Sequence, residues 1–78
     1  MTETLDTAYA ALLGALDEKP DQERYKAIRD LEARFTSDMK ERKAGIANRL
    51  HHDRSWTEVG KLLGVTGSRA EQISRAAR

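Results

Sequence analysis

The stretch from Ser55 to Ser74, SWTEVGKLLGVTGSRAEQIS, constrains the fold of this chain more than any other. Apolar residues at helical spacing lead up to Gly64, and a glycine in this place commonly ends a helix because it adopts positive φ at little cost. Thr66 then offers a hydroxyl that can cap a second helix. Gly60 leaves room for that helix to cross closely, and Val65 can fill the gap between the two. The spacing therefore predicts a helix-turn-helix.

The pattern also predicts how this motif is bounded and packed. The two helices are expected over residues 57–63 and 67–77, with Ser55 or Thr57 capping the first of them. Trp56, the only tryptophan, is expected in the core or at the start of the helix rather than stacked on a base. The expected packing sets Ile46, Ala47 and Leu50 against Trp56, Val59, Leu63 and Ile73.

Two further helices are expected before the motif, one from Thr2 to about Leu16 and one from Pro20 to about His52. A seven-residue gap in the apolar pattern of the second, together with a glycine, predicts a kink or break near residues 36–37 or 43–45. Its apolar stripe is either a dimerisation seam or the inner face of a hairpin with the first helix. The stripe consists of Tyr25, Ile28, Leu31, Phe35, Met39, Ile46 and Leu50.

Length and charge place these helices in one small all-α domain, residues 1–78. The chain has no cysteine, so neither a disulfide nor a zinc–thiolate site supports its core. Residues 1–38, the expected acidic hairpin, hold five basic and nine acidic residues. Residues 39–78, the expected three-helix unit, hold nine basic and four acidic ones. The basic part thus contains the helix-turn-helix at residues 57–77, as binding to phosphates requires.

Other functional classes find little support in the sequence. No apolar run is long enough to span a membrane and no signal peptide is recognisable, so the expected location is the cytoplasm. The sequence has no Ser/His/Asp order, no glycine-rich phosphate loop and no metal-ligand spacing. His51 and His52 are adjacent and cannot both face one metal from a helix. We therefore expect no enzymatic activity and no cofactor.

The run TEVGKLLGVTGSRAEQI resembles the helix-turn-helix of region 4 of bacterial sigma factors, which reads roughly EIGxxLGVSxxRVxQI. It is also similar to the DNA-binding tails of resolvase-type recombinases and to small actinobacterial regulators with a SWxEIGxxLGVS core. The resemblance covers residues 55–77 and implies a helix that lies in the major groove of DNA. The sequence departs from the pattern at Gly67, where a basic or polar residue is usual, and at Ala70, where valine or isoleucine is usual.

The resemblance implies a role for several residues of this chain. Thr66 corresponds to a capping serine whose hydroxyl and amide meet phosphate, and Arg69 to an arginine near the DNA backbone. Ser68, Glu71 and Gln72 match positions that face the groove. Glutamine can pair with adenine through two hydrogen bonds, and glutamate can accept one from cytosine N4. The further expected phosphate contacts are Arg54, Lys61, Arg75 and Arg78. The alternative for all of them is a solvated helix face.

Together these features predict a sequence-specific transcriptional regulator that binds double-stranded DNA with helix 67–77. We expect a homodimer on a two-fold-related site, because one such unit offers few contacts. The alternative is a protein-interaction module in which the helix-turn-helix is a scaffold. The acidic N-terminal helices would then bind RNA polymerase or another protein.

Overall fold

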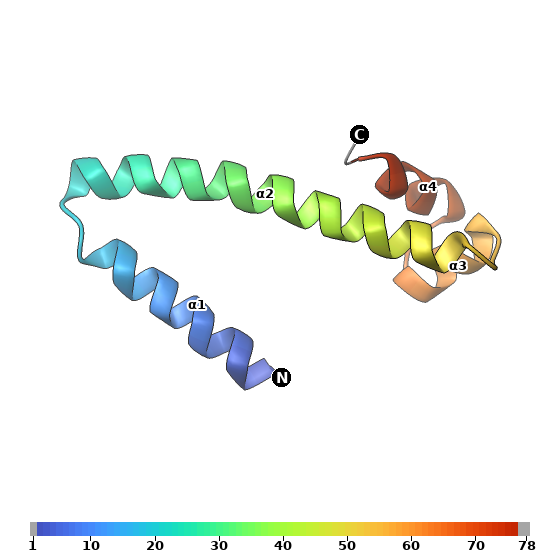
Figure 1. The fold of residues 1–78 in the computed structure, drawn as a ribbon, viewed down its shortest axis with the longest axis horizontal. Coiled ribbons are helices and arrows are strands. Elements are labelled where there is room, and N and C mark those ends of the chain that lie inside the picture. The colour runs from blue at the N-terminus through green and yellow to red at the C-terminus, as the bar shows by residue number, and fades with distance from the viewer. Residues whose placement is uncertain (1, 77–78) are drawn as a thin grey trace. The chain divides into compact units, whose positions relative to one another are not determined.

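The computed structural model describes residues 2–76, which form four helices and no strand. The helices are α1 (Thr2–Asp17), α2 (Asp21–His51), α3 (Trp56–Leu63) and α4 (Gly67–Arg75) (Figure 1). The all-α prediction is confirmed. The chain divides into two compact units, residues 1–33 and 34–78, which we call the N-terminal and C-terminal units. The division falls inside α2. The predicted end of the last helix at Ala77 lies outside the described residues.

In the N-terminal unit, backbone hydrogen bonds define the end of α1 and the start of α2. The Lys19 amide donates to the carbonyl of Leu16 at 3.1 Å, and the Arg24 amide donates to the carbonyl of Pro20 at 2.8 Å. Pro20 therefore lies just before α2 rather than at its predicted first position. The Arg24 guanidinium pairs with Asp17 at 3.6 Å and with Asp21. Since these pairs are exposed, each contributes at most about 1 kcal/mol.

The apolar side chains of α1 remain open to solvent. Leu5 is 72% exposed and Tyr9 63% exposed, while Leu12 and Leu13 are 41% and 42% exposed. The hairpin interpretation expected Leu12, Leu13 and Leu16 to be buried, but of these three only Leu16 is partly buried. The N-terminal unit thus carries an amphipathic helix whose apolar face is uncovered.

The core of the C-terminal unit is built from small side chains. Ala44 and Ala47 of α2, Val59 of α3 and Ala70 of α4 are buried. The inward face of α2 passes through two alanines, so the missing large apolar residue before Gly45 does not interrupt it. The predicted break in α2 is wrong, because one helix runs through both suspected places. Ile46, predicted to lie in the core, is 42% exposed.

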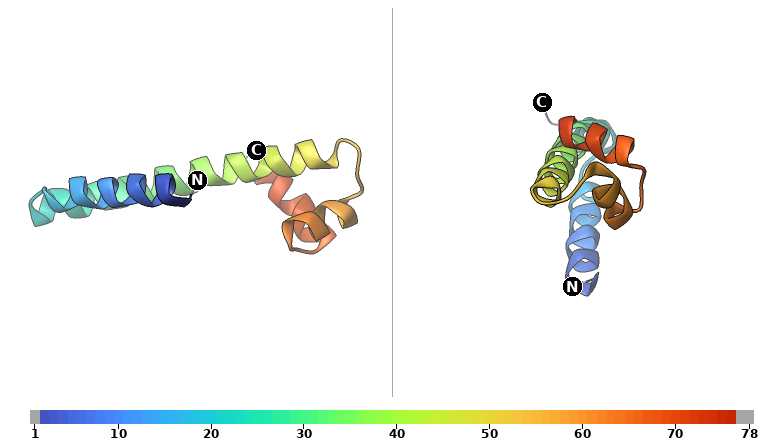
Figure 2. Two further views of the ribbon diagram at one scale, coloured as in Figure 1. Left: turned by 90° about the horizontal axis from the view of Figure 1, so that it is seen from below. Right: turned by 90° about the vertical axis from the view of Figure 1, so that its right-hand side faces the viewer.

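A polar contact joins α2 to α4 beside this core. The Asn48 side-chain amide donates to the carbonyls of Ala44, at 2.9 Å, and Ser74, at 3.2 Å. The buried Ser74 hydroxyl donates in turn to the Glu71 carbonyl at 2.6 Å. Figure 2 shows α3 and α4 beside the C-terminal part of α2. The bond from Asn48 to Ser74 fixes the register of α4 against α2, and it was not predicted from the sequence.

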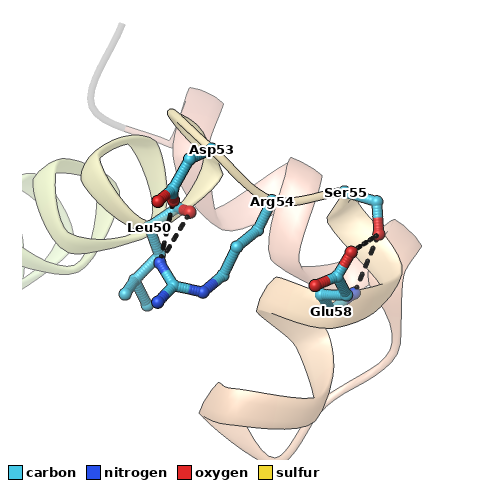
Figure 3. A network of polar contacts seen from close by, with 5 residues as sticks. All are labelled: Leu50, Asp53, Arg54, Ser55 and Glu58. Atoms are coloured by element: carbon cyan, nitrogen blue, oxygen red, sulfur yellow. Dashed lines mark hydrogen bonds and ion pairs between the residues drawn. The ribbon is translucent and has the colours of Figure 1, made fainter.

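Side chains also order the connection between α2 and α3 (Figure 3). Ser55 is the N-terminal cap of α3: its hydroxyl oxygen accepts the Glu58 amide hydrogen at 3.2 Å. Arg54 turns back, and its guanidinium donates to the carbonyl of Leu50, at 3.4 Å, and to the carboxylate of Asp53, at 3.0 Å. Just before and after this connection, the rings of His51 and Trp56 stack with centroids 3.8 Å apart. The stacked rings therefore help to hold the start of α3 beside the end of α2.

Candidate nucleic-acid interface

The turn between α3 and α4 has the geometry that the sequence predicted. Gly64 has φ of 75°, and its amide donates to the Lys61 carbonyl at 3.4 Å. The next amide, of Val65, donates to the Gly60 carbonyl at 2.8 Å. Thr66 then caps α4, because its hydroxyl oxygen accepts the Arg69 amide hydrogen at 3.0 Å. The turn thus sets the starting point and direction of α4.

Two further glycines bring the helices close together. A β-carbon on Gly60 would lie 2.6 Å from the carbonyl oxygen of Val65 and 2.7 Å from the carbonyl carbon of Thr66. One on Gly67 would lie 3.1 Å from the backbone nitrogen of Thr57, in the first turn of α3. Gly67 therefore faces α3 at close range, which gives a packing reason for a glycine at this position.

The two faces of α4 differ in burial. Ala70 and Ser74 are buried, and Gly67, Glu71 and Ile73 are partly buried. The small Ala70 side chain is fully enclosed. The exposed side chains are Ser68, Arg69, Gln72 and Arg75. Four of the five predicted contact residues within α4 therefore belong to its outward-facing side, and Glu71 lies at the edge of the packed side.

Two side-chain pairs lie along the exposed part of α4. The Arg75 guanidinium pairs with the Glu71 carboxylate one helical turn earlier. The Arg69 guanidinium donates to the amide oxygen of Gln72 at 3.5 Å. The Glu71 carboxylate already accepts from Arg75, so it is a poorer acceptor for cytosine than the sequence suggested. Both pairs are weak because they are solvated, and a stronger anionic partner can displace them.

The remaining predicted contacts lie outside α4. Lys61 is exposed on α3. Arg54 is 39% exposed, but its guanidinium is engaged at the end of α2. Thr66 is exposed at the start of α4. The structure thus groups Thr66 with the exposed residues of α4, places Lys61 on the neighbouring helix, and gives Arg54 a structural contact. Arg78 lies outside the described residues.

A groove lies between α2, the turn and α4, and we call it the α2–α4 groove. Val65, predicted to fill the gap between helices, is instead 36% exposed and forms part of its wall. The groove has a volume of about 320 Å³. Its lining consists of Lys43, Ile46, Leu63, Val65, Arg69 and Ile73. The sequence did not predict this groove, because Ile46 was expected to lie in the core.

Comparison of the chain with protein-family models, with curated proteins and with solved structures finds no significant match. Within residues 2–76, none of the helices is both long enough and apolar enough to cross a membrane. A functional assignment therefore depends on the geometry and charge of the chain itself.

Proposed function

We propose that this protein is a sequence-specific DNA-binding transcriptional regulator that inserts α4 into the major groove. The observation that carries the proposal is the outward-facing side of α4, where Ser68, Arg69 and Gln72 are exposed together. An α-helix fits the major groove, and these polar side chains are suited to base edges and phosphates. The caps at Gly64 and Thr66 hold the helix in place for such contacts.

The distribution of charge supports a polyanionic partner for the C-terminal unit. Residues 34–78 hold ten basic and five acidic residues, whereas residues 1–33 hold four and eight. A net positive unit gains affinity for DNA by releasing counterions from phosphates. The sequence resemblance to sigma-factor and recombinase helix-turn-helices points in the same direction.

The proposal includes a homodimer that joins two copies through α2. Tyr25 and Phe35 of this helix are 64% and 63% exposed, and Ile28 is 37% exposed. Large aromatic and aliphatic side chains exposed on one helix commonly mark a protein–protein surface. A dimer would present two copies of α4 to two-fold-related half-sites.

Arg69→Ala is expected to weaken binding to all duplexes alike. Removing one phosphate contact should lower the slope of log affinity against log salt by about one unit. Fluorescence anisotropy with labelled duplexes over a series of salt concentrations measures this slope. Lys26→Ala removes the same charge from an exposed position of the N-terminal unit and should leave the slope unchanged. An unaltered slope with a new sequence preference for Arg69→Ala would reassign the residue to base reading.

Gln72→Ala is expected to act on one base pair of the preferred site. Losing a two-bond contact with adenine costs about 1–3 kcal/mol on that site and relaxes the choice at that position. Competition binding with single-base variants of the site measures the effect, with Gln22→Ala as a matched control at an exposed position of α2. An equal loss of affinity on the selected site and on random DNA would show that Gln72 does not read a base.

A second candidate function is a protein-interaction module that binds RNA polymerase or another protein. The uncovered apolar face of α1 favours it, since Leu5 is 72% exposed. The two functions differ in how binding depends on salt. Steeply salt-dependent binding to duplex DNA supports the regulator, whereas a stable protein complex without any affinity for duplex DNA supports the interaction module.

A further inference from the structure

We propose that α1 of one copy of the chain docks into the α2–α4 groove of a second copy. The groove walls are apolar, with Ile46 from α2, Val65 from the turn and Ile73 from α4. Lys43 and Arg69 line the same groove, and both recur with Lys40 in an adjoining depression. Among residues 2–76, no acidic residue lines either one. The surface therefore combines an apolar floor with three cations.

A small molecule is a poor match for this groove. Its volume of about 320 Å³ is at the lower limit of ligand pockets, which run from about 300 to 1,000 Å³ and enclose most of the ligand. The polar side chains among its lining residues are two exposed cations. An apolar surface with a basic rim is instead suited to an amphipathic helix that carries negative charge.

The chain itself contains such a helix. α1 has the sequence TETLDTAYAALLGALD, with three acidic residues and no basic one. Leu5, Tyr9 and Leu12 follow at helical spacing and are 72%, 63% and 41% exposed. At about 100° per residue around the helix axis, Asp6 and Asp17 lie on one flank of this apolar face. The apolar face of α1 can therefore cover the apolar floor while its carboxylates approach the cations of the groove.

Helix length favours a second copy over the same chain. The 16 residues of α1 extend about 24 Å at a rise of about 1.5 Å per residue. Lys43 follows Asp21, the first residue of α2, by 22 residues, which corresponds to about 33 Å along the helix. An α1 helix that folded back along α2 of its own chain would end short of the groove. Docking between copies has no such restriction.

Docking of α1 would oppose DNA binding. This consequence rests on the proposed function, because Arg69 is both a residue of the groove and the expected phosphate contact. A carboxylate of α1 and a DNA phosphate would compete for the same guanidinium. The acidic helix would thus keep the protein off non-specific DNA until a high-affinity site displaces it.

The absence of cysteine allows a direct test by cross-linking. One chain carries Leu12→Cys in α1 and the other carries Ile46→Cys in the groove, both at positions about 40% exposed. The two full-length chains are mixed and oxidised mildly, and the mixed disulfide is quantified by electrophoresis. We expect it to form several-fold faster than with Lys61→Cys, which is exposed on α3 and does not line the groove. Equal rates for the two cysteine positions would overturn the docking.

Charge dependence gives a second readout on the same chains. Adding Lys43→Glu to the Ile46→Cys chain, or raising the salt to about 1 M, should slow the cross-link several-fold, because both weaken the attraction of α1 to the groove. Circular dichroism is used to check that the Lys43→Glu chain is folded. If neither change affects the rate of cross-linking, charge does not attract α1 to the groove. That result would contradict the choice of the acidic helix α1 as the occupant.

Adding duplex DNA to the cross-linking reaction distinguishes docking of α1 from DNA binding. An excess of DNA that is shown by anisotropy to bind the protein should slow the cross-link. Bound DNA that leaves the rate unchanged would overturn the competition at Arg69. A chain that forms the specific cross-link but binds no duplex at any salt concentration would overturn the DNA-binding proposal while retaining the docking.

Discussion

Replacing Gly60 with alanine is expected to unfold the helix-turn-helix or to force its two helices apart. The new β-carbon would lie 2.6 Å from the Val65 carbonyl oxygen and 2.7 Å from the Thr66 carbonyl carbon. Both are backbone atoms of a tight turn, so no side-chain rotation relieves the clash. Overpacking of this kind costs about 1–3 kcal/mol, and more where the surroundings are rigid. In so small a core this is a large fraction of the total stability.

Gly45→Ala is the matched control in the same unit. A β-carbon at Gly45 would approach only the guanidinium of Arg49, at 3.1 Å, and that side chain can move. Alanine in a helix interior is favoured over glycine by about 0.5–1 kcal/mol, so this variant should be slightly more stable. Urea unfolding followed by circular dichroism measures both variants. A Gly60→Ala midpoint equal to that of the unaltered protein would contradict the close crossing of the helices.

Phe35→Asp is expected to give a folded chain that no longer dimerises through α2 and that binds DNA about 10²–10⁴-fold more weakly than the dimer, the range by which two linked sites exceed one. Phe35 is 63% exposed on α2, so the substitution removes little core packing. A carboxylate in an apolar seam would instead prevent two copies from associating. α4 would be unchanged, but it would lose the partner that occupies the second half-site.

Ala33→Asp adds the same charge at an exposed position on a different side of α2 and should leave both assembly and affinity unchanged. Sedimentation equilibrium gives the oligomeric state, and anisotropy on the same samples gives the affinity. An unaltered protein that is monomeric at tens of micromolar would end the dimer proposal. A Phe35→Asp variant that stays dimeric at about 1 M salt, where docking of α1 is weakened, would show that the seam lies elsewhere.

The features of this fold that the sequence predicted are those determined by local chemistry. Ser55 and Thr66 cap helices because their hydroxyl groups reach amide hydrogens three residues ahead. Gly64 ends α3 because it adopts positive φ at little cost. Arg69 and Gln72 are exposed, which agrees with the positions that the resemblance implied for them. Each of these features depends only on residues within one or two helical turns of one another.

Features determined by contacts between distant segments could not be read from the sequence in this way. The large side chain of Ile46 predicted burial, but the short side chains of Ala44 and Ala47 allow α2 to approach its neighbours on another face. The bond from Asn48 to the Ser74 carbonyl joins positions 26 residues apart. Nothing in the sequence near Asn48 identifies that acceptor. The groove was missed for the same reason, because its walls come from three separate segments.

Selection of bound fragments from a pool of random duplex DNA shows whether the protein binds DNA sequence-specifically. The unaltered full-length chain is incubated with the pool at low salt, and bound fragments are recovered and sequenced over several rounds. A dimeric sequence-specific regulator should enrich one sequence with two-fold-related halves, and its affinity for that sequence should fall steeply as salt is raised. A protein that is folded by circular dichroism, yet enriches no sequence and binds no duplex at low salt, would contradict the proposed function.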